Sequence, residues 1–465
     1  MSLYKQLAEQ IAGDIEDNKL QRGSRLPSLR QLAKQHSISM TTAVDCYQEL
    51  ESLGLIKAKP QTGYYVAEKS SSLPPPTSSQ FTSRITVPRA SPITTHHHSG
   101  PLGVSGSALT DSEQTELERS FRRVMRRIGH RLSSYPNSQG EQGLRLALAN
   151  HFSELGIAGK EHDFVVTSGC MSAMKTALEV CSEQGDAVAI SSPCFNGTLE
   201  LLHVLKRKIV EIPSLEEGID LDQLEEHLKC GRVKTGVFCT SHMNPQGITM
   251  SPKQKRRLAR LANQYQVPII EDDVYLELSY SAHCPLPAKY YDDGGYIFWC
   301  GSVSKSLSPS YRVGWCIPGR FQDQYHQHFA AGCYGVSTPT QLALADFIDS
   351  GQYAKLLKAK RTRLLEQREQ YLTYLARHLP KGAKVSHPQG GFVVWVQIPA
   401  LNGRKLVDDL TEHQIDVRPG VLFTTLDLYH DCLRINIGHP LEGGAKSELD
   451  KLLSVINQNL TRKMK

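Results

Sequence analysis

Three helical patterns open the chain. The first is an apolar stripe that repeats every four residues, formed by Leu3, Leu7, Ile11 and Ile15. It predicts a helix reaching to about Asp17. Ser28 is placed to cap a second short helix, and Ser39 is placed to cap a third, which Gly54 ends. Two helices joined by the tight turn between them predict a helix-turn-helix.

A β-hairpin is predicted directly after the third helix. Residues 55–59 and 64–67 are short β-prone runs, and the turn between them contains Gly63. The hairpin would be the wing of a winged helix-turn-helix (α+β) spanning residues 1–68. In such modules the N-terminal end of the third helix enters the major groove, while the second helix and the wing contact phosphates. The predicted base-reading residues are Ser39, Met40, Thr41 and Thr42, and the predicted phosphate contacts are Ser28, Arg30, Lys57, Lys59 and Gly63.

Charge supports a nucleic-acid partner for this module. The net charge of the 465-residue chain is only +6, but residues 19–44 carry several Lys and Arg and no Asp or Glu. A basic run is commonly a solvated face, yet here it coincides with a DNA-binding pattern, so double-stranded DNA is the predicted partner. A small three-helix packing module without DNA affinity is the alternative.

Residues 69–108 have the composition of a linker. They are rich in Ser, Pro, Thr and Gly without sustained periodicity, which predicts a flexible segment. The run His96–His98 has no acidic or thiol neighbour, so we interpret it as solvated linker and predict no metal site. No apolar run approaches the roughly 20 residues of a membrane span, and the 11 cysteines are scattered. A cytoplasmic protein with reduced thiols is expected.

From residue 109 to residue 465, β-rich apolar runs alternate with helical patterns. The predicted strands are 164–167, 187–190, 208–212, 237–240, 267–270 and 297–300. Such alternation predicts a mainly parallel α/β sheet, whose ligands gather at the carboxyl ends of the strands.

Candidate chemistry lies at those strand ends, in five short segments. They carry Gly169, Cys170, Met171, Phe195, Asn244, Asp272, Tyr275, Ser302, Lys305 and Arg312. The first segment opens a helix, so its backbone amides can hold a phosphate. Later segments offer a carboxylate at Asp272 for a protonated pyridine nitrogen and an amine nucleophile at Lys305. Each piece alone has an ordinary structural explanation, but in order they match the needs of one cofactor.

The N-terminal module resembles the GntR family of bacterial repressors and activators over residues 2–67. The resemblance rests on the segment LPSLRQLAKQHSISMTTAVDCYQELESLGLI, followed by TGYYV. Met40 departs from the family pattern, because many members have an arginine there. Base preference therefore does not transfer from relatives.

The large domain resembles the fold-type I enzymes of aminotransferase class I, which bind pyridoxal 5'-phosphate (PLP). Asn244, Asp272 and Lys305 follow one another in the order and spacing typical of that group. The resemblance implies that Lys305 forms the Schiff base with PLP, that Asp272 pairs with the pyridinium, and that Asn244 and Tyr275 hold the phenolic oxygen. It also implies a smaller C-terminal α+β subdomain from about residue 355.

The same resemblance assigns the other groups around the cofactor. Phe195 would stack on the ring, and Tyr135 matches a tyrosine lent by the neighbouring subunit. Arg434 matches the arginine that clamps a substrate carboxylate. The phosphate would be held by Gly169, Cys170, Met171, Ser302 and Arg312. Phe195 stands where relatives often have Tyr, and Gly169–Met171 lacks a glutamine common among them, but neither departure removes a chemical role.

Taken together, the two halves resemble the MocR subfamily of bacterial regulators. The resemblance implies a head-to-tail homodimer in which the PLP site senses an amine or amino-acid effector and transcription is the output. A catalytically competent aminotransferase is the main alternative, because Lys305, Asp272 and Arg434 are all present. A cofactor-free dimer scaffold would be favoured only if Lys305 or Asp272 were missing.

Overall fold

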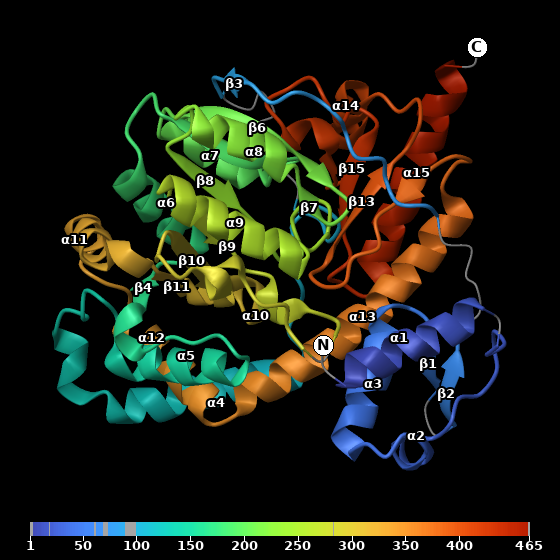
Figure 1. The fold of residues 1–465 in the computed structure, drawn as a ribbon, viewed down its shortest axis with the longest axis horizontal. Coiled ribbons are helices and arrows are strands. Elements are labelled where there is room, and N and C mark those ends of the chain that lie inside the picture. The colour runs from blue at the N-terminus through green and yellow to red at the C-terminus, as the bar shows by residue number, and fades with distance from the viewer. Residues whose placement is uncertain are drawn as a thin grey trace.

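The N-terminal module is a winged helix-turn-helix, as predicted (Figure 1). The computed structural model describes residues 3–17, 19–59, 62–67, 73–88, 99–281 and 283–463. The module consists of α1 (Leu3–Glu16), α2 (Leu29–Gln35), α3 (Met40–Ser52), β1 (Ile56–Lys59) and β2 (Gly63–Val66). It has a buried core of its own, to which Leu7, Ile15 and Tyr47 contribute.

Local capping explains where these helices begin and end. The Ser28 side chain accepts a hydrogen bond from the backbone of Gln31, whose side chain accepts one from the Ser28 backbone in return. Ser39 caps α3 by accepting from the backbone of Thr42. Gly54, directly after α3, has a φ of +69°, a left-handed conformation that glycine adopts without a steric cost.

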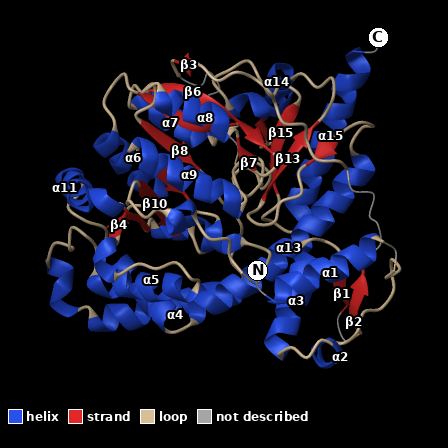
Figure 2. Ribbon diagram, in the orientation of Figure 1, coloured by secondary structure: helices blue, strands red, loops and turns tan. Residues whose placement is uncertain are grey.

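The large domain is built on a 9-stranded sheet with the order β3-β6-β5-β8-β9-β10-β11-β4, in which β7 pairs with β6 (Figure 2). The strands are β3 (Ile85–Thr86), β4 (Val165–Thr167), β5 (Ala187–Ser192), β6 (Lys208–Leu215), β7 (Gly218–Ile219), β8 (Thr235–Phe238), β9 (Ile269–Asp272), β10 (Ile297–Ser302) and β11 (Gly314–Ile317). The run from β6 to β10 is parallel, whereas β3, β11 and β4 are antiparallel to their neighbours. The predicted mainly parallel sheet is confirmed.

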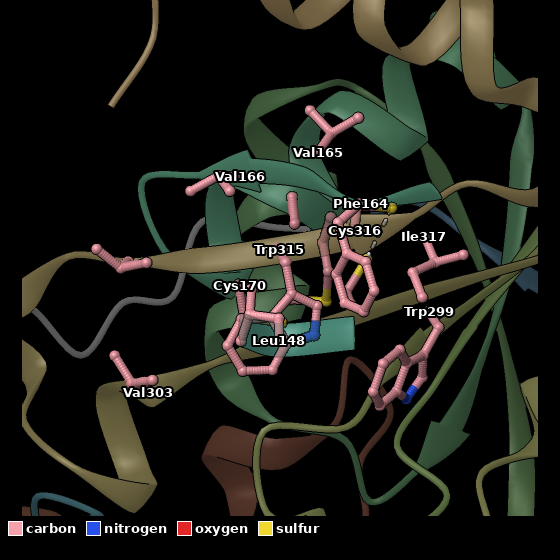
Figure 3. Close-up of a cluster of buried hydrophobic side chains, with 14 of the residues drawn as sticks. Leu148, Phe164, Val165, Val166, Cys170, Trp299, Val303, Trp315, Cys316 and Ile317 are labelled. Carbon is pink, nitrogen blue, oxygen red and sulfur yellow. Dashed lines mark hydrogen bonds between the residues drawn. The ribbon is translucent and has the colours of Figure 1, made fainter. Parts of the chain in front are cut away.

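Helices enclose this sheet and bury its apolar side chains. They are α4 (Asp111–Arg127), α5 (Gln142–Glu154), α6 (Cys170–Cys181), α7 (Asn196–Val204), α8 (Leu221–Lys229), α9 (Pro252–Tyr265), α10 (Val303–Ser306), α11 (Gln322–Gly332) and α12 (Thr338–Asp349). Figure 3 shows part of the core, where Trp299 and Trp315 from adjacent strands lie with Leu148 from α5. The Phe152 ring contacts the Trp299 ring edge-on, with 4.8 Å between centroids. Close packing of this kind leaves little room for β10 to shift.

A smaller α+β lobe follows, as predicted. It contains an antiparallel sheet with the order β12-β13-β15-β14. Its elements are α13 (Gln352–His378), β12 (Lys384–Val385), β13 (Val393–Gln397), α14 (Gly403–Glu412), β14 (Arg418–Pro419), β15 (Cys432–Asn436) and α15 (Gly443–Lys463). Tyr353 on α13 belongs to the large-domain core, whereas Leu364 and Tyr371 on the same helix belong to the core of the small lobe. One continuous helix therefore joins the two lobes.

The structure contradicts the flexible linker in the parts of it that are described. Residues 73–88, here called the strap, lie along both lobes: the Pro74 carbonyl accepts from the Val385 backbone of the small lobe, and β3 pairs with β6 of the large sheet. Residues 99–108 also pack inward, and Leu102 is fully buried. Composition missed this because the hydrogen-bond partners are far away in the sequence. His96–His98 lie outside the described residues.

Candidate cofactor and DNA-binding sites

The carboxyl ends of β9 and β10 bring a carboxylate and an amine to one edge of the sheet. β9 ends at Asp272, and β10 continues into α10, which carries Lys305. Asp272 lies opposite Cys300 in the parallel register of the two strands. Burial lowers the pKa of Lys305, and the negative charge of Asp272 partly opposes that lowering. The resemblance implies that Asp272 pairs with the ring nitrogen of PLP and that Lys305 forms the Schiff base, and both roles remain predictions.

The surroundings of the Lys305 amine would suit a nucleophile. Its Nζ donates a hydrogen bond of 2.6 Å to the Ser105 carbonyl. Loss of solvation and the nearby Arg434 charge lower the pKa of Lys305 to about 8, although Asp272 opposes them. A lowered pKa increases the neutral fraction of the amine near neutral pH, and the neutral amine is the form that attacks a carbonyl carbon.

Asp272 is oriented by two donors on one of its oxygens. Oδ1 accepts from Sγ of Cys170 at 3.3 Å and from the Val274 backbone at 3.4 Å. Loss of solvation raises the pKa of Asp272 to about 6, which leaves the carboxylate mostly ionised at neutral pH. Both contacts engage Oδ1. Oδ2 accepts no hydrogen bond from the described residues, so it is available to pair with a cationic ring nitrogen.

Asn244, Tyr275 and Arg434 form one connected polar group. Nδ2 of Asn244 donates to the Tyr275 hydroxyl at 3.3 Å, and Oδ1 accepts from Nη1 of Arg434 at 3.1 Å. Nη2 of Arg434 donates to the Gly103 carbonyl. The Arg434 side chain is buried, with 3% exposure for the residue, and its Nε has no hydrogen-bond partner among the described residues. A buried cation with an unused donor can take a carboxylate as ligand.

The start of α6 and the Arg312 side chain form a cradle for an anion. Gly169 precedes α6 with a φ of +97°, and a Cβ added there would approach Nη2 of Arg312 to 2.7 Å. Arg312 donates to the Ser168 carbonyl at 2.9 Å, and Cys170 and Met171 begin the helix. Backbone amides at a helix start attract phosphate. Ser302 lies nearby, with its hydroxyl donating to the carbonyl of Val313, the residue after Arg312.

Phe195 and Tyr135 are the two remaining predicted residues of the cofactor site. Phe195 directly follows the turn after β5 and precedes α7, where it is partly exposed at the carboxyl edge of the sheet. Tyr135 is 89% exposed and contacts the Tyr334 ring at 6.1 Å between centroids, so it is not joined to the site of its own chain. Its predicted role in a neighbouring subunit remains a prediction.

Sequence reasoning missed the segment that closes the site, because it assigned Gly103 and Ser105 to the linker. The Ser105 hydroxyl lies 2.7 Å from the Tyr275 hydroxyl, and its carbonyl accepts from Lys305. The usable signal was the apolar Leu102 within a Ser/Gly-rich stretch, since an isolated apolar residue can anchor an otherwise polar segment to a core.

The groups at this edge of the sheet match the chemical groups of PLP. Lys305 would provide the amine for the aldehyde carbon, Asp272 would provide the anion for the ring nitrogen, and Arg312 with the start of α6 would provide the phosphate cradle. The described residues contain no group of three or more His, Cys, Asp or Glu side chains arranged for a metal ion.

The N-terminal module exposes most of its predicted DNA contacts. Met40 and Thr41 are exposed at the start of α3, Arg30 is exposed on α2, and Lys57 and Lys59 are exposed on β1. Three further predicted residues also serve the local fold: Ser28 and Ser39 cap helices, and the Thr42 hydroxyl lies 2.8 Å from that of Ser39. Gly63 opens β2 with a φ of +109°. Within the described part of the chain, no helix is both long and apolar enough to cross a bilayer.

The large domain has the fold of PLP-dependent aminotransferases. The α-aminoadipate aminotransferase LysN of Thermus thermophilus superposes with a TM-score of 0.71 at 23% identity, over 77% of this chain and 92% of that chain. The multiple substrate aminotransferase of Thermococcus profundus gives a TM-score of 0.70 at 23% identity, over 78% and 92%.

Family comparison identifies both halves of the chain. Residues 3–66 match the bacterial regulatory proteins of the gntR family, and residues 104–455 match aminotransferase class I and II. Two uncharacterized HTH-type transcriptional regulators of Escherichia coli, YdcR and YjiR, are 33% and 31% identical over 94% and 97% of this chain, and over 95% and 98% of their own lengths. The chain belongs to this family of GntR-type transcriptional regulators with an aminotransferase-like domain, the MocR architecture.

Proposed function

We propose that this regulator senses an amine or amino acid at its PLP site and converts the occupancy of that site into a change in operator binding. One observation carries the proposal: the Lys305 amine and the Arg434 guanidinium both bond to residues 103–105 in a chain that also carries a DNA-binding module. An effector with an amine and a carboxylate would replace both contacts at once.

Each side chain of the site would have its own role in binding the cofactor or the effector. When bound, PLP supplies an electrophilic carbon that amines can attack. Asp272 keeps a proton on the ring nitrogen, Asn244 and Tyr275 orient the ring oxygen, and Arg434 holds the effector carboxylate. The effector changes DNA binding only if it has different affinities for two states of the protein.

A head-to-tail homodimer would complete the site. Tyr135, Tyr334 and Leu132 are 89%, 79% and 57% exposed, which leaves apolar surface available for a second copy. Tyr135 would then reach the cofactor phosphate of the other subunit, and two modules would face DNA together. We place its action in the bacterial cytoplasm, on the nucleoid when bound to DNA.

The test is DNA protection by the intact, PLP-loaded protein across a titration of amino acids and amines. We expect sequence-selective protection that one class of amine changes. A competent aminotransferase is the second candidate, because Lys305, Asp272 and Arg434 are all in place. Amine-insensitive DNA binding together with rapid turnover of an amino acid to its oxo acid would favour the enzyme.

Arg434→Ala should remove selectivity for effectors that bear a carboxylate. The lost bidentate contact is worth roughly 1.5–3 kcal/mol, or about 10- to 100-fold in affinity. The measurement compares the dissociation constants of an amino acid and of its decarboxylated amine. Arg404→Ala, which changes a side chain 75% exposed in the same lobe, is the control. Retained selectivity in Arg434→Ala would mean that the effector carboxylate binds elsewhere.

Asp272→Asn should weaken PLP binding roughly 10- to 100-fold, because a neutral amide replaces a charge-assisted pair with the ring nitrogen. The wild-type affinity should also fall as the pH drops through about 6, where Asp272 takes up a proton, whereas the variant should lack this step. Fluorescence titration of PLP measures both effects. Asp273→Asn is the matched control, since its Oδ2 accepts from the Trp299 indole instead. Equal affinities in the wild type and Asp272→Asn would assign the ring contact to another carboxylate.

A further inference from the structure

The third helix of the N-terminal module is in contact with the large domain through a short surface loop. Ser281 donates a hydrogen bond of 2.7 Å to Oε2 of Glu49 on α3. Nε2 of His283 lies 3.4 Å from Oδ2 of Asp45, and its ring stacks on Tyr4 with 4.7 Å between centroids. We call residues 281, 283 and 284 the docking loop. The loop holds α1 and α3 at the same time.

Docking leaves the predicted base-reading end of α3 open. Thr41, Asp45 and Glu49 are spaced by four residues, so they lie on one face of the helix. The docking loop contacts the second half of that face, whereas Met40 and Thr41 remain exposed. The contact therefore fixes the direction in which α3 points without covering its first turn.

Arg361 on α13 ties the docking loop to the interior of the large domain. Its Nη2 donates to Sγ of Cys284 at 3.1 Å, and its Nε donates to the Glu277 carbonyl at 2.7 Å. The Glu277 carboxylate lies 2.5 Å from Nε2 of His151 and 2.6 Å from the Tyr353 hydroxyl. Coulombic attraction and hydrogen bonding from His151 hold the pKa of Glu277 below its ordinary value despite burial. The loop thus rests on a buried charged network.

The same network holds the residue next to the cofactor lysine. The Tyr353 hydroxyl lies 2.7 Å from Oγ of Ser306, and Lys360 donates to the Ser306 carbonyl at 2.9 Å. Ser306 directly follows Lys305 on α10. Tyr353 and Lys360 are each 1% exposed and lie on α13, as does Arg361. Figure 1 shows α13 running from the large domain toward the N-terminal module, and a Cβ added at Gly54, directly after α3, would lie 3.8 Å from Nη2 of Arg368 on α13.

We propose that the docking loop, Arg361 and the Glu277 network connect Lys305 to the orientation of α3. This inference rests on the proposed function, because it gives the route by which cofactor and effector occupancy reaches DNA. A change at Lys305 shifts α10, and the two bonds to Ser306 pass that shift to α13. Arg361 on α13 then moves the loop that holds α3. A packed and fully bonded network transmits such a shift because it has few alternative arrangements.

Amide hydrogen exchange of the full-length protein tests the connection. In the wild type, fixing PLP on Lys305 with borohydride should change exchange severalfold in peptides covering α3 and the docking loop. Arg361→Lys should keep the visible cofactor band but abolish this response, because one ammonium cannot span both acceptors. Arg363→Lys is the matched control, since Arg363 lies on the same helix but pairs with Glu113 at 2.7 Å. An identical response in wild type and Arg361→Lys would overturn the connection.

Operator geometry tests the docking contact itself. The wild type should discriminate roughly tenfold or more between half-site spacings that differ by half a helical turn, because docked modules have a set orientation. The double variant Ser281→Ala, His283→Ala should reduce that discrimination severalfold and increase α3 exchange with or without PLP. His162→Ala is the control. Nε2 of His162 lies 3.5 Å from Oδ1 of Asp163, and neither residue belongs to α3 or to the docking loop.

The outcomes separate this inference from the proposed function. A wild-type protein that gains no visible band with PLP contradicts the proposed function. A wild-type protein that gains the band, but whose α3 exchange does not respond to it, contradicts only the connection through Arg361. Unchanged α3 exchange in the double variant contradicts the docking contact.

Discussion

Lys305→Ala is expected to lose covalently bound cofactor completely. The wild type should be yellow with PLP, and borohydride reduction should fix the cofactor onto one lysine, which peptide mapping identifies. Among the described residues, Lys255 and Lys360 are also buried with a lowered pKa, so peptide mapping must distinguish three candidate lysines. Of these three, Lys305 alone shares its site with the Asp272 carboxylate and the phosphate cradle, so the modified peptide should contain Lys305.

The pH dependence of loading provides a second check on Lys305. Because the pKa of Lys305 is lowered to about 8, the neutral fraction of its amine increases as the pH rises toward 8. The rate of covalent loading should therefore increase up to about that pH and level off above it. Lys255→Gln is the control and should keep the visible band, because Nζ of Lys255 is occupied by Ser241 and the Leu286 carbonyl. A band that survives in Lys305→Ala would move the nucleophile to another lysine.

The isolated N-terminal module, residues 1–67, should bind an operator about 10²- to 10⁴-fold more weakly than the intact protein. Two modules carried by one dimer engage two half-sites, and the second binding event gains a high effective concentration that the free module lacks. The module has a separate core, so it can be studied alone. Gel retardation on operator fragments with one and two half-sites measures the difference.

Single substitutions in the intact protein serve as controls for that comparison. Arg30→Ala should weaken binding to all duplexes and reduce the salt slope by about one unit, because one fewer counterion is released. Thr41→Ala should instead change the preference among operators by roughly 1–3 kcal/mol. Equal affinities of the module and the intact protein would contradict the dimer, and a lack of selective protection by the intact protein would favour an enzyme.

Sequence reasoning predicted the winged helix-turn-helix, the mainly parallel sheet and the strand-end positions of Asp272 and Lys305 because the signals are local. Ser28 and Ser39 cap helices through bonds to residues three positions away, which a linear pattern reveals. Asp272 ends β9 and Lys305 follows β10, two parallel strands whose carboxyl ends meet at one edge of the sheet. Position along the chain was therefore enough to place these groups together.

Long-range bonds decided the parts that the sequence did not reveal. The composition of the strap and of residues 99–108 predicted flexibility, yet these segments pair with β6, with the Val385 backbone and with Lys305, more than a hundred residues away. Their composition describes low apolar content, but it carries no information about which backbone groups on a distant surface are free to bond.

Local patterns in the sequence thus determined a winged helix-turn-helix and a mainly parallel sheet with Asp272 and Lys305 at the carboxyl ends of two of its strands. Only the tertiary structure decided that Ser105 closes the site and that Glu49 of α3 rests on Ser281. It alone also placed Arg361 between the docking loop and the Glu277 network. The physical reason is that burial and hydrogen bonding between distant segments depend on the packed arrangement of the whole chain, whereas caps, turns and strand ends depend on neighbours in the sequence.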